Sequence, residues 1–266
     1  MNHLLLAIFM ATVTQLIELF GIFFVAGFVL SKLQTAISRQ YARTIGWAGI
    51  LWTAWIGTPI HELGHVVLAT IFRHRIHRIS LFQPNPNTGN LGSVEHSFNP
   101  KSLYQRIGNF FIGAAPLLFG TLFLTALLLI LVPQGKEILE PFAPGASLEA
   151  FFVGLVRTFQ LLFSVENLRA WHFWLFLYIS FCIASHVAPS KEDRRGMWGG
   201  FFWIILLLFV LNTIAIGFQK PGLTAWLGNL NHYFGVFVGI FLYTIVLSLI
   251  HLITAIIFFA PFRIRR

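Results

Sequence analysis

The residues best suited to chemistry in this chain are His61, Glu62 and His65, within the stretch GTPIHELGHVVLAT at residues 57–70. Histidines at positions i and i+4 of a helix lie on one face, so two imidazoles at this spacing can bind one Zn²⁺. The metal lowers the pKa of a water towards ~7, and Glu62 would take the proton and pass it to a leaving amine. The sequence therefore predicts His61 and His65 as metal ligands and Glu62 as the catalytic base of a hydrolase.

These three polar residues stand in apolar sequence, with GWAGILWTAWIG before them and VVLATIF after them. An ionisable residue deep in a membrane span costs on the order of 3 kcal/mol on insertion scales, and three within five residues compound the penalty. The alternative is a chance pattern in which backbone carbonyls satisfy each imidazole. The cost favours a metal site, because ionisable residues inside a span are functional by default.

The composition indicates that lipid is the solvent of this protein. Of 266 residues, 57% are hydrophobic and only 10% are charged, whereas soluble domains carry about 25% charged residues. The net charge of +9 is better explained by basic loops on anionic lipid than by nucleic acid, so no nucleic-acid partner is expected. Cys182 is the single cysteine, which excludes an intrachain disulfide and a thiolate metal cluster.

The apolar segments predict an all-α polytopic membrane protein with about six transmembrane helices and a small β-hairpin after the second. A span needs about 20 apolar residues, and the segments that qualify are 4–30, 45–72, 108–133, 170–188, 197–217 and 233–261. The hairpin is expected at 78–98, where β-prone residues flank the turn-rich PNPNTGN. Residues 147–168 have the apolar spacing of an amphipathic helix on the membrane surface.

Lysine and arginine residues suggest an orientation for these helices. With a cytoplasmic N-terminus, the segments on the inside carry eleven of the eighteen basic residues and those on the outside carry seven, among them three in the 31–43 loop. The positive-inside rule therefore favours this orientation. It places HELGH in the cytoplasmic half of the second span, so the site is expected to face the cytoplasm.

A third metal ligand has to come from another span, because hydrolytic zinc sites have three protein ligands and one open position. The fourth span ends at a matching depth in SHVAPSKEDRRG, residues 185–196, which contains His186, Glu192 and Asp193. A carboxylate neutralises the ion better than another imidazole in a poorly solvated site, so Asp193 is expected ahead of His186. Two other roles compete for Asp193: the capping-box pattern with Ser190, and pairing with the arginines that follow.

The chain resembles the site-2 protease family of intramembrane zinc metalloproteases over about residues 45–200. HELGH at 61–65 matches its HExxH helix, GNFFIGAAP at 108–116 is similar to its Gly-Pro element, and SHVAPSKEDRRG is similar to its N-x-x-P-x-x-x-x-D-G element. The last element departs from the family pattern. His186 stands at the asparagine position, Pro189 lies one residue closer to Asp193, and an arginine follows the aspartate.

This resemblance implies an enzyme that hydrolyses peptide bonds of membrane-protein substrates within or beside the lipid bilayer. Zn²⁺ would be held by His61, His65 and Asp193, with His186 as the alternative third ligand. Asn109 and His186 would contact substrate. The expected units are an N-terminal helix and loop (1–44), a metalloprotease core (45–200) and C-terminal transmembrane helices (201–266), in a bacterial or archaeal cell membrane.

Two other functions stay open at this point. One is a zinc-binding membrane scaffold or pseudoprotease without turnover, and the other is a metal or proton transporter, which would be expected to show inverted repeats. The sequence leaves the substrate and the oligomeric state open. Of the other polar residues in the spans, Asn212 and His251 are interpreted as structural partners, whereas Glu18 has either a functional or a structural role.

Overall fold

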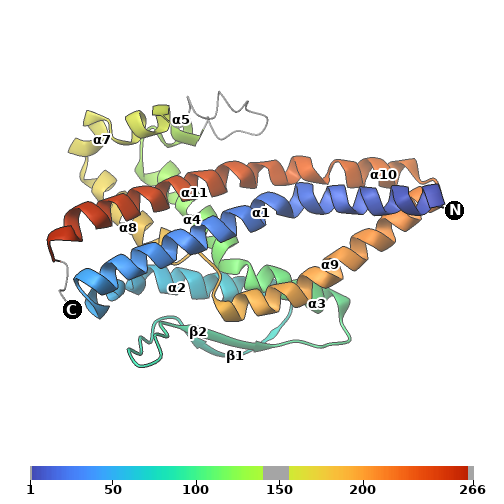
Figure 1. Ribbon diagram of the computed structural model, residues 1–266, viewed down its shortest axis with the longest axis horizontal. Coiled ribbons are helices and arrows are strands. Elements are labelled where there is room, and N and C mark those ends of the chain that lie inside the picture. The colour runs from blue at the N-terminus through green and yellow to red at the C-terminus, as the bar shows by residue number, and fades with distance from the viewer. Residues whose placement is uncertain (1, 140–155, 263–266) are drawn as a thin grey trace.

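The structure is a computed structural model that describes residues 2–139 and 156–262 (Figure 1). It is helical apart from one hairpin. The elements are α1 (Asn2–Thr44), α2 (Trp47–Ile71), β1 (Arg75–Ser80), β2 (Ser93–Ser97), α3 (Leu103–Gly113), α4 (Ala115–Leu131), α5 (Gly135–Leu139), α7 (Val165–Arg169), α8 (Trp171–Ala184), α9 (Lys191–Gly217), α10 (Pro221–Gly228), α11 (Leu230–Phe259) and a 3₁₀ turn (Ala260–Phe262).

Two long helices, α1 and α11, pack against each other along the length of the molecule (Figure 1). Helices α2, α4 and α8 pack together towards one end, and α9 packs on α1 and α3 towards the other. The hairpin lies against α2 on the side away from α1. The junction of the two halves is where α2, α3 and the start of α9 meet.

Aromatic rings fill the junction between α1, α3 and α9. Phe110 of α3 packs edge-on against Phe20, with 5.2 Å between the ring centroids, and also contacts Phe23 and Phe201. Helices α3 and α9 approach closely because Gly200 of α9 faces the backbone of Phe110, where a Cβ atom would clash. This contact holds α3 firmly against the helix that carries Asp193.

Three helices are long and apolar enough to cross a membrane: His3–Thr44, Lys191–Gly217 and Phe237–Phe259. The pair α3 and α4, bent by 57°, makes a fourth if it counts as one span. The chain is therefore a helical membrane protein, but the six expected spans are not all reached. Helix α2 is less apolar because it contains HELGH, and α8, with 14 residues, is only about 21 Å long.

The sequence predicts a loop at residues 31–43, but these residues continue α1 as a helix. The reason is an apolar face that the loop interpretation overlooked. Ile37 and Tyr41 lie one turn apart and are buried against Ala255 of α11. At about 65 Å, α1 is longer than the ~30 Å hydrocarbon core, so part of it extends beyond the lipid tails.

The expected amphipathic helix at 147–168 falls partly outside the described residues, which resume at 156. In the described part, residues 156–162 are helical and the helix stops before Ser164. The Ser164 hydroxyl accepts a hydrogen bond from the Asn167 amide and begins α7. The segment from 156 to 168 is thus two short helices rather than one continuous surface helix.

The predicted hairpin is confirmed as two antiparallel strands, and it begins three residues earlier than expected. Arg75 pairs with Ser97 and Ile79 with Val94, with a bulge between Ile76 and Arg78. The connection between the strands returns to the side of α2 that carries Glu62.

Candidate metal centre

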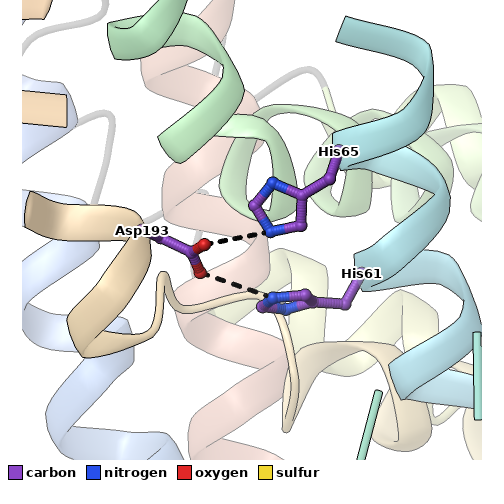
Figure 2. Close-up of side chains that lie close together, drawn as sticks. All are labelled: His61, His65 and Asp193. Carbon is purple, nitrogen blue, oxygen red and sulfur yellow. Dashed lines mark ion pairs between the residues drawn. The ribbon is translucent and has the colours of Figure 1, made fainter. Parts of the chain in front are cut away.

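Three ligand-type side chains converge where α2 meets the first turn of α9 (Figure 2). His61 and His65 project from one face of α2, and Asp193 faces both of them from α9. The Nε2 atom of His61 lies 3.5 Å from one Asp193 carboxylate oxygen, and the Nε2 atom of His65 lies 3.2 Å from the other. One ligand atom from each residue lies within 4.8 Å of the other two, so this group could hold a metal ion.

Main-chain carbonyls fix the orientation of both imidazole rings. The Nδ1 atom of His61 lies 2.7 Å from the carbonyl oxygen of His186, and that of His65 lies 2.8 Å from the carbonyl oxygen of Ile112. A carbonyl only accepts hydrogen bonds, so each Nδ1 carries the proton. In the neutral imidazoles both Nε2 lone pairs therefore point at Asp193, which is the arrangement that outer partners impose on metal-binding histidines.

This geometry favours a proton or a metal ion between the three side chains. Two bare nitrogen atoms and a carboxylate are all acceptors, and at these distances they repel one another unless protons or a metal lie between them. One divalent ion satisfies all three ligands at once. The donor set of two histidines and one carboxylate fits Zn²⁺ and leaves a fourth position open for water or substrate.

Asp193 also caps helix α9. One of its carboxylate oxygens accepts a hydrogen bond from the Ser190 amide at 2.7 Å, and the Ser190 hydroxyl accepts one from the Asp193 amide at 3.1 Å. The Arg194 guanidinium donates to the Pro189 carbonyl at 2.7 Å. The capping role and the ligand role, which competed in the sequence, are thus compatible, because the two oxygens of one carboxylate serve both.

Two glycines allow the surrounding elements to approach the centre. Gly113, at the end of α3, faces the Asp193 carbonyl, and a Cβ atom there would clash with it. Gly57 of α2 similarly faces the Cys182 carbonyl and the ring of His186. Gly113, the first residue of the Gly-Ala-Ala-Pro element, therefore lets the start of α9 approach the end of α3.

The segment 185–190 is an unwound connection between α8 and α9, and side chains of the site satisfy its backbone. The His186 carbonyl accepts from His61, the Ala188 amide donates to the side-chain oxygen of Gln34 at 3.1 Å, and the Ser190 amide donates to Asp193. Gln34, on α1, is a residue that the sequence interpretation missed. Its position in a helix beside Ser31 and Thr35 offered only a weak polar signal.

Glu62 lines a cavity of about 870 Å³ together with the three ligand-type residues. Its side chain is buried, with 7% exposed. The hairpin connection covers it, since a Cβ atom on Gly92 would lie 2.9 Å from the Glu62 Cγ atom. The cavity is lined by residues of α1, α2, α3, the hairpin and the 186–196 segment, so it is large enough for a peptide segment beside the glutamate.

The two residues predicted to contact substrate have different surroundings. Asn109, on α3, lines the cavity. His186 also lines the cavity, but its Nδ1 atom lies 3.0 Å from the Cys182 carbonyl and its ring is outside the group of three ligands. The alternative assignment of His186 as third ligand is therefore not what the geometry favours, and its main-chain oxygen acts instead by holding His61.

Two histidines near the hairpin, His74 and His96, pair with each other, and His96 lines the cavity. His74 is buried, with 6% exposed, and its Nδ1 atom lies 3.1 Å from the Nδ1 atom of His96. Burial lowers the pKa of His74 and lowers that of His96 to about 4. The pairing joins the end of α2 to β2 over a sequence distance that local patterns do not reveal.

Asn212 and His251, two polar residues within apolar helices, each contact a polar side chain of another helix. Asn212 of α9 donates to Gln15 at 2.8 Å and to Thr12 at 3.1 Å, both on α1. His251 of α11 lies 2.8 Å from the Tyr41 hydroxyl through its Nε2 atom and stacks on Phe181. Their contacts agree with the structural roles expected for Asn212 and His251.

No protein-family model, curated protein or solved structure matches this chain. The functional argument therefore depends on the geometry of the site.

Proposed function

We propose that this protein is an intramembrane zinc metalloendopeptidase similar to the site-2 proteases, which hydrolyses peptide bonds of membrane proteins within or beside the bilayer. One observation carries the proposal. The Nε2 atoms of His61 and His65 converge with the Asp193 carboxylate while main-chain carbonyls hold both Nδ1 atoms. Glu62, between the two histidines in sequence, lines the same cavity.

Zinc is the metal that this donor set fits best for hydrolysis. Its chemistry when bound is Lewis acidity, which makes water nucleophilic at neutral pH and polarises a carbonyl. With two neutral histidines and one carboxylate, the ion keeps a net charge of +1 in a poorly solvated site, which favours an anionic nucleophile.

Each residue of the site then has a defined role. His61, His65 and Asp193 hold the cation, and the carbonyls of His186 and Ile112 keep the imidazoles in the required tautomer. Glu62 accepts the proton of the attacking water and donates it to the amine of the leaving peptide. Burial of Glu62 beneath the hairpin connection limits the access of bulk water to this proton transfer.

The substrate has to be locally unwound, because the carbonyls of a transmembrane helix are engaged in hydrogen bonds within the helix. The two-stranded hairpin offers a free edge, and β-addition there would hold such a segment extended. Following the distribution of lysine and arginine, we place the site towards the cytoplasmic side of a bacterial or archaeal cell membrane.

The decisive test replaces the base and leaves the ligands in place. Glu62→Gln should bind as much zinc as wild type, measured by mass spectrometry of the purified protein, and should cleave dye-labelled β-casein in detergent micelles about 10²–10⁴ times more slowly, the usual contribution of a general base. Turnover equal to wild type would refute the hydrolytic role. The same variant, immobilised, is suited to trapping uncleaved membrane substrates.

Two alternatives would give different results in these measurements. A zinc-binding scaffold or pseudoprotease would bind the metal, and neither wild type nor Glu62→Gln would cleave. A metal transporter would move Zn²⁺ into proteoliposomes, whereas a protease would not. Iron rather than zinc in the purified protein would instead indicate oxygen-dependent chemistry, because two histidines and one carboxylate also bind non-haem iron.

A further inference from the structure

The histidine pair at the edge of the cavity determines which nitrogen of His96 carries a proton. The Nε2 atom of His74 lies 3.0 Å from the Gln105 carbonyl oxygen, and its Nδ1 atom lies 3.1 Å from the Nδ1 atom of His96. A carbonyl accepts hydrogen bonds and cannot donate, so the Nε2 atom of His74 is protonated. In a neutral imidazole this leaves the His74 Nδ1 atom as an acceptor.

His96 must therefore donate through its own Nδ1 atom. Both rings are held in the neutral form, since burial lowers the pKa of each histidine. A neutral imidazole protonated at Nδ1 has a bare lone pair at Nε2. The chain of hydrogen bonds from Gln105 through His74 thus makes His96 Nε2 an acceptor at neutral pH.

This acceptor belongs to a ring that lines the metal-site cavity. His96 lies on β2 and borders the same cavity as Glu62, His65 and Asp193. In the described part of the chain its Nε2 atom makes no hydrogen bond, and its ring lies outside the group of three ligands. This nitrogen lone pair belongs to none of the three ligand-type residues, so it is available to accept a hydrogen bond from a molecule that enters the cavity.

We propose that His96 is a substrate-binding residue that accepts a hydrogen bond from a main-chain N–H group of the extended peptide. The proposal rests on the proteolytic function proposed above. An unwound peptide carries amide N–H groups that have lost their helical partners, and each of these groups needs an acceptor. A main-chain contact of this kind selects extended peptide without selecting its side chains.

Two amide substitutions separate this role from a role in docking the hairpin. In His96→Asn the side-chain amide takes the place of Nδ1–H and still reaches His74, but the acceptor facing the cavity is lost. In His96→Gln the longer side chain places its oxygen near the Nε2 position and restores the acceptor, while the contact with His74 is lost. His77→Asn, on the exposed face of β1, is the matched control.

With dye-labelled β-casein as the probe, His96→Asn should raise KM about tenfold with kcat within about twofold of wild type, as expected for lost uniform binding. His96→Gln should restore most of the affinity, and His77→Asn should match wild type. The opposite pattern, a normal His96→Asn and an impaired His96→Gln, would show a docking role and overturn the proposal. All variants should retain wild-type zinc content.

A second measurement does not depend on turnover. In ¹⁵N-histidine-labelled full-length protein, NMR should show the His96 ring protonated at Nδ1 and bare at Nε2, and protonation at Nε2 would overturn the proposal. If wild type cleaves no faster than Glu62→Gln, the proteolytic function fails and the substrate role fails with it. If wild type cleaves and His96→Asn behaves identically, the function stands and only the role of His96 is refuted.

Discussion

Two groups of buried polar side chains stand in the apolar helices of this protein, and they are built differently. In the group of Thr12, Gln15 and Asn212, every contact joins a donor to an acceptor: Asn212 donates to Gln15 and to Thr12, and Thr12 donates to the Ile8 carbonyl. At the candidate metal centre, the atoms that face one another are all acceptors when both imidazoles are neutral.

The difference separates a polar group that is complete in itself from one that is suited to bind a ligand. A cluster whose donors and acceptors match is complete without a ligand and contributes to helix packing. A cluster in which main-chain carbonyls supply the outer hydrogen bonds, and lone pairs converge beside a cavity, is suited to bind a cation. Counting polar residues in the spans does not separate the two cases, whereas matching donors with acceptors does.

The largest expected effect is the loss of metal when a ligand is removed. His65→Ala and Asp193→Ala should lower zinc affinity by more than about 100-fold, beyond the 10–100-fold effect of losing an outer hydrogen-bond partner. The measurement is competition with a chromogenic chelator. Ser190→Ala is the control for Asp193, because it weakens the helix cap without removing a ligand atom. Equal affinity in Asp193→Ala and Ser190→Ala would show that Asp193 is only a cap.

A smaller loss of zinc affinity is expected when a ligand residue is displaced but not removed. Gly113→Ala introduces a methyl group against the Asp193 carbonyl and should lower zinc affinity by about 10–100-fold. Gly199→Ala, on α9, meets open space and should leave the affinity unchanged. Similar affinities in the two variants would mean that the first turn of α9 can shift without disturbing the centre.

Substitutions in the cluster of Thr12, Gln15 and Asn212 should change the stability of the protein and leave its metal binding unchanged. Asn212→Leu removes three hydrogen bonds to Thr12 and Gln15 and should lower the free energy of unfolding by about 1 kcal/mol, measured by denaturation in mixed micelles. Adding Gln15→Leu should recover part of the loss, because an unpaired amide no longer remains buried. Zinc affinity should stay at the wild-type value in both variants, and a decrease would contradict the separation of the two clusters.

The smallest expected effect is a dependence of hairpin docking on pH. The pKa of His96 is lowered from 6.5 to about 4 in the folded state, so the undocked hairpin binds protons more readily. Docking is therefore fully stable above about pH 6.5 and weakens as the pH falls towards 4. Hydrogen exchange should show less protection of β2 at pH ~5 than at pH ~7 after correction for intrinsic rates. Helix α10, which contains no histidine, is the internal reference, and unchanged protection of β2 would contradict the expectation.

The sequence predicts the parts of this molecule that depend on local spacing. The turn of helix that carries His61 and His65 follows from an i, i+4 pattern, and the hairpin follows from turn residues between β-prone segments. Asp193 is predicted as the third metal ligand from its depth in the membrane and its charge. In the structure it lies beside the two histidines.

The rest depends on contacts between distant segments. The helical continuation of α1 through 31–44 is stabilised by packing on α11, and the short α8 ends because the chain unwinds at the metal centre. The pairing of His74 with His96 and the orientation of His61 by a carbonyl 125 residues away leave no periodic signal. These contacts become apparent only when the helices are assembled.

The unwound connection at 185–190 has a consequence for how such a centre can be altered. Its free main-chain groups are taken up by His61, Gln34, Asp193 and Arg194, and Pro189 has no amide hydrogen to satisfy. If α8 and α9 formed one continuous helix, the His186 carbonyl and the Ser190 amide would form hydrogen bonds within that helix. They would then no longer orient His61 and Asp193. A continuous α8–α9 helix would therefore disrupt the centre even though His61, His65 and Asp193 are all still present in the sequence.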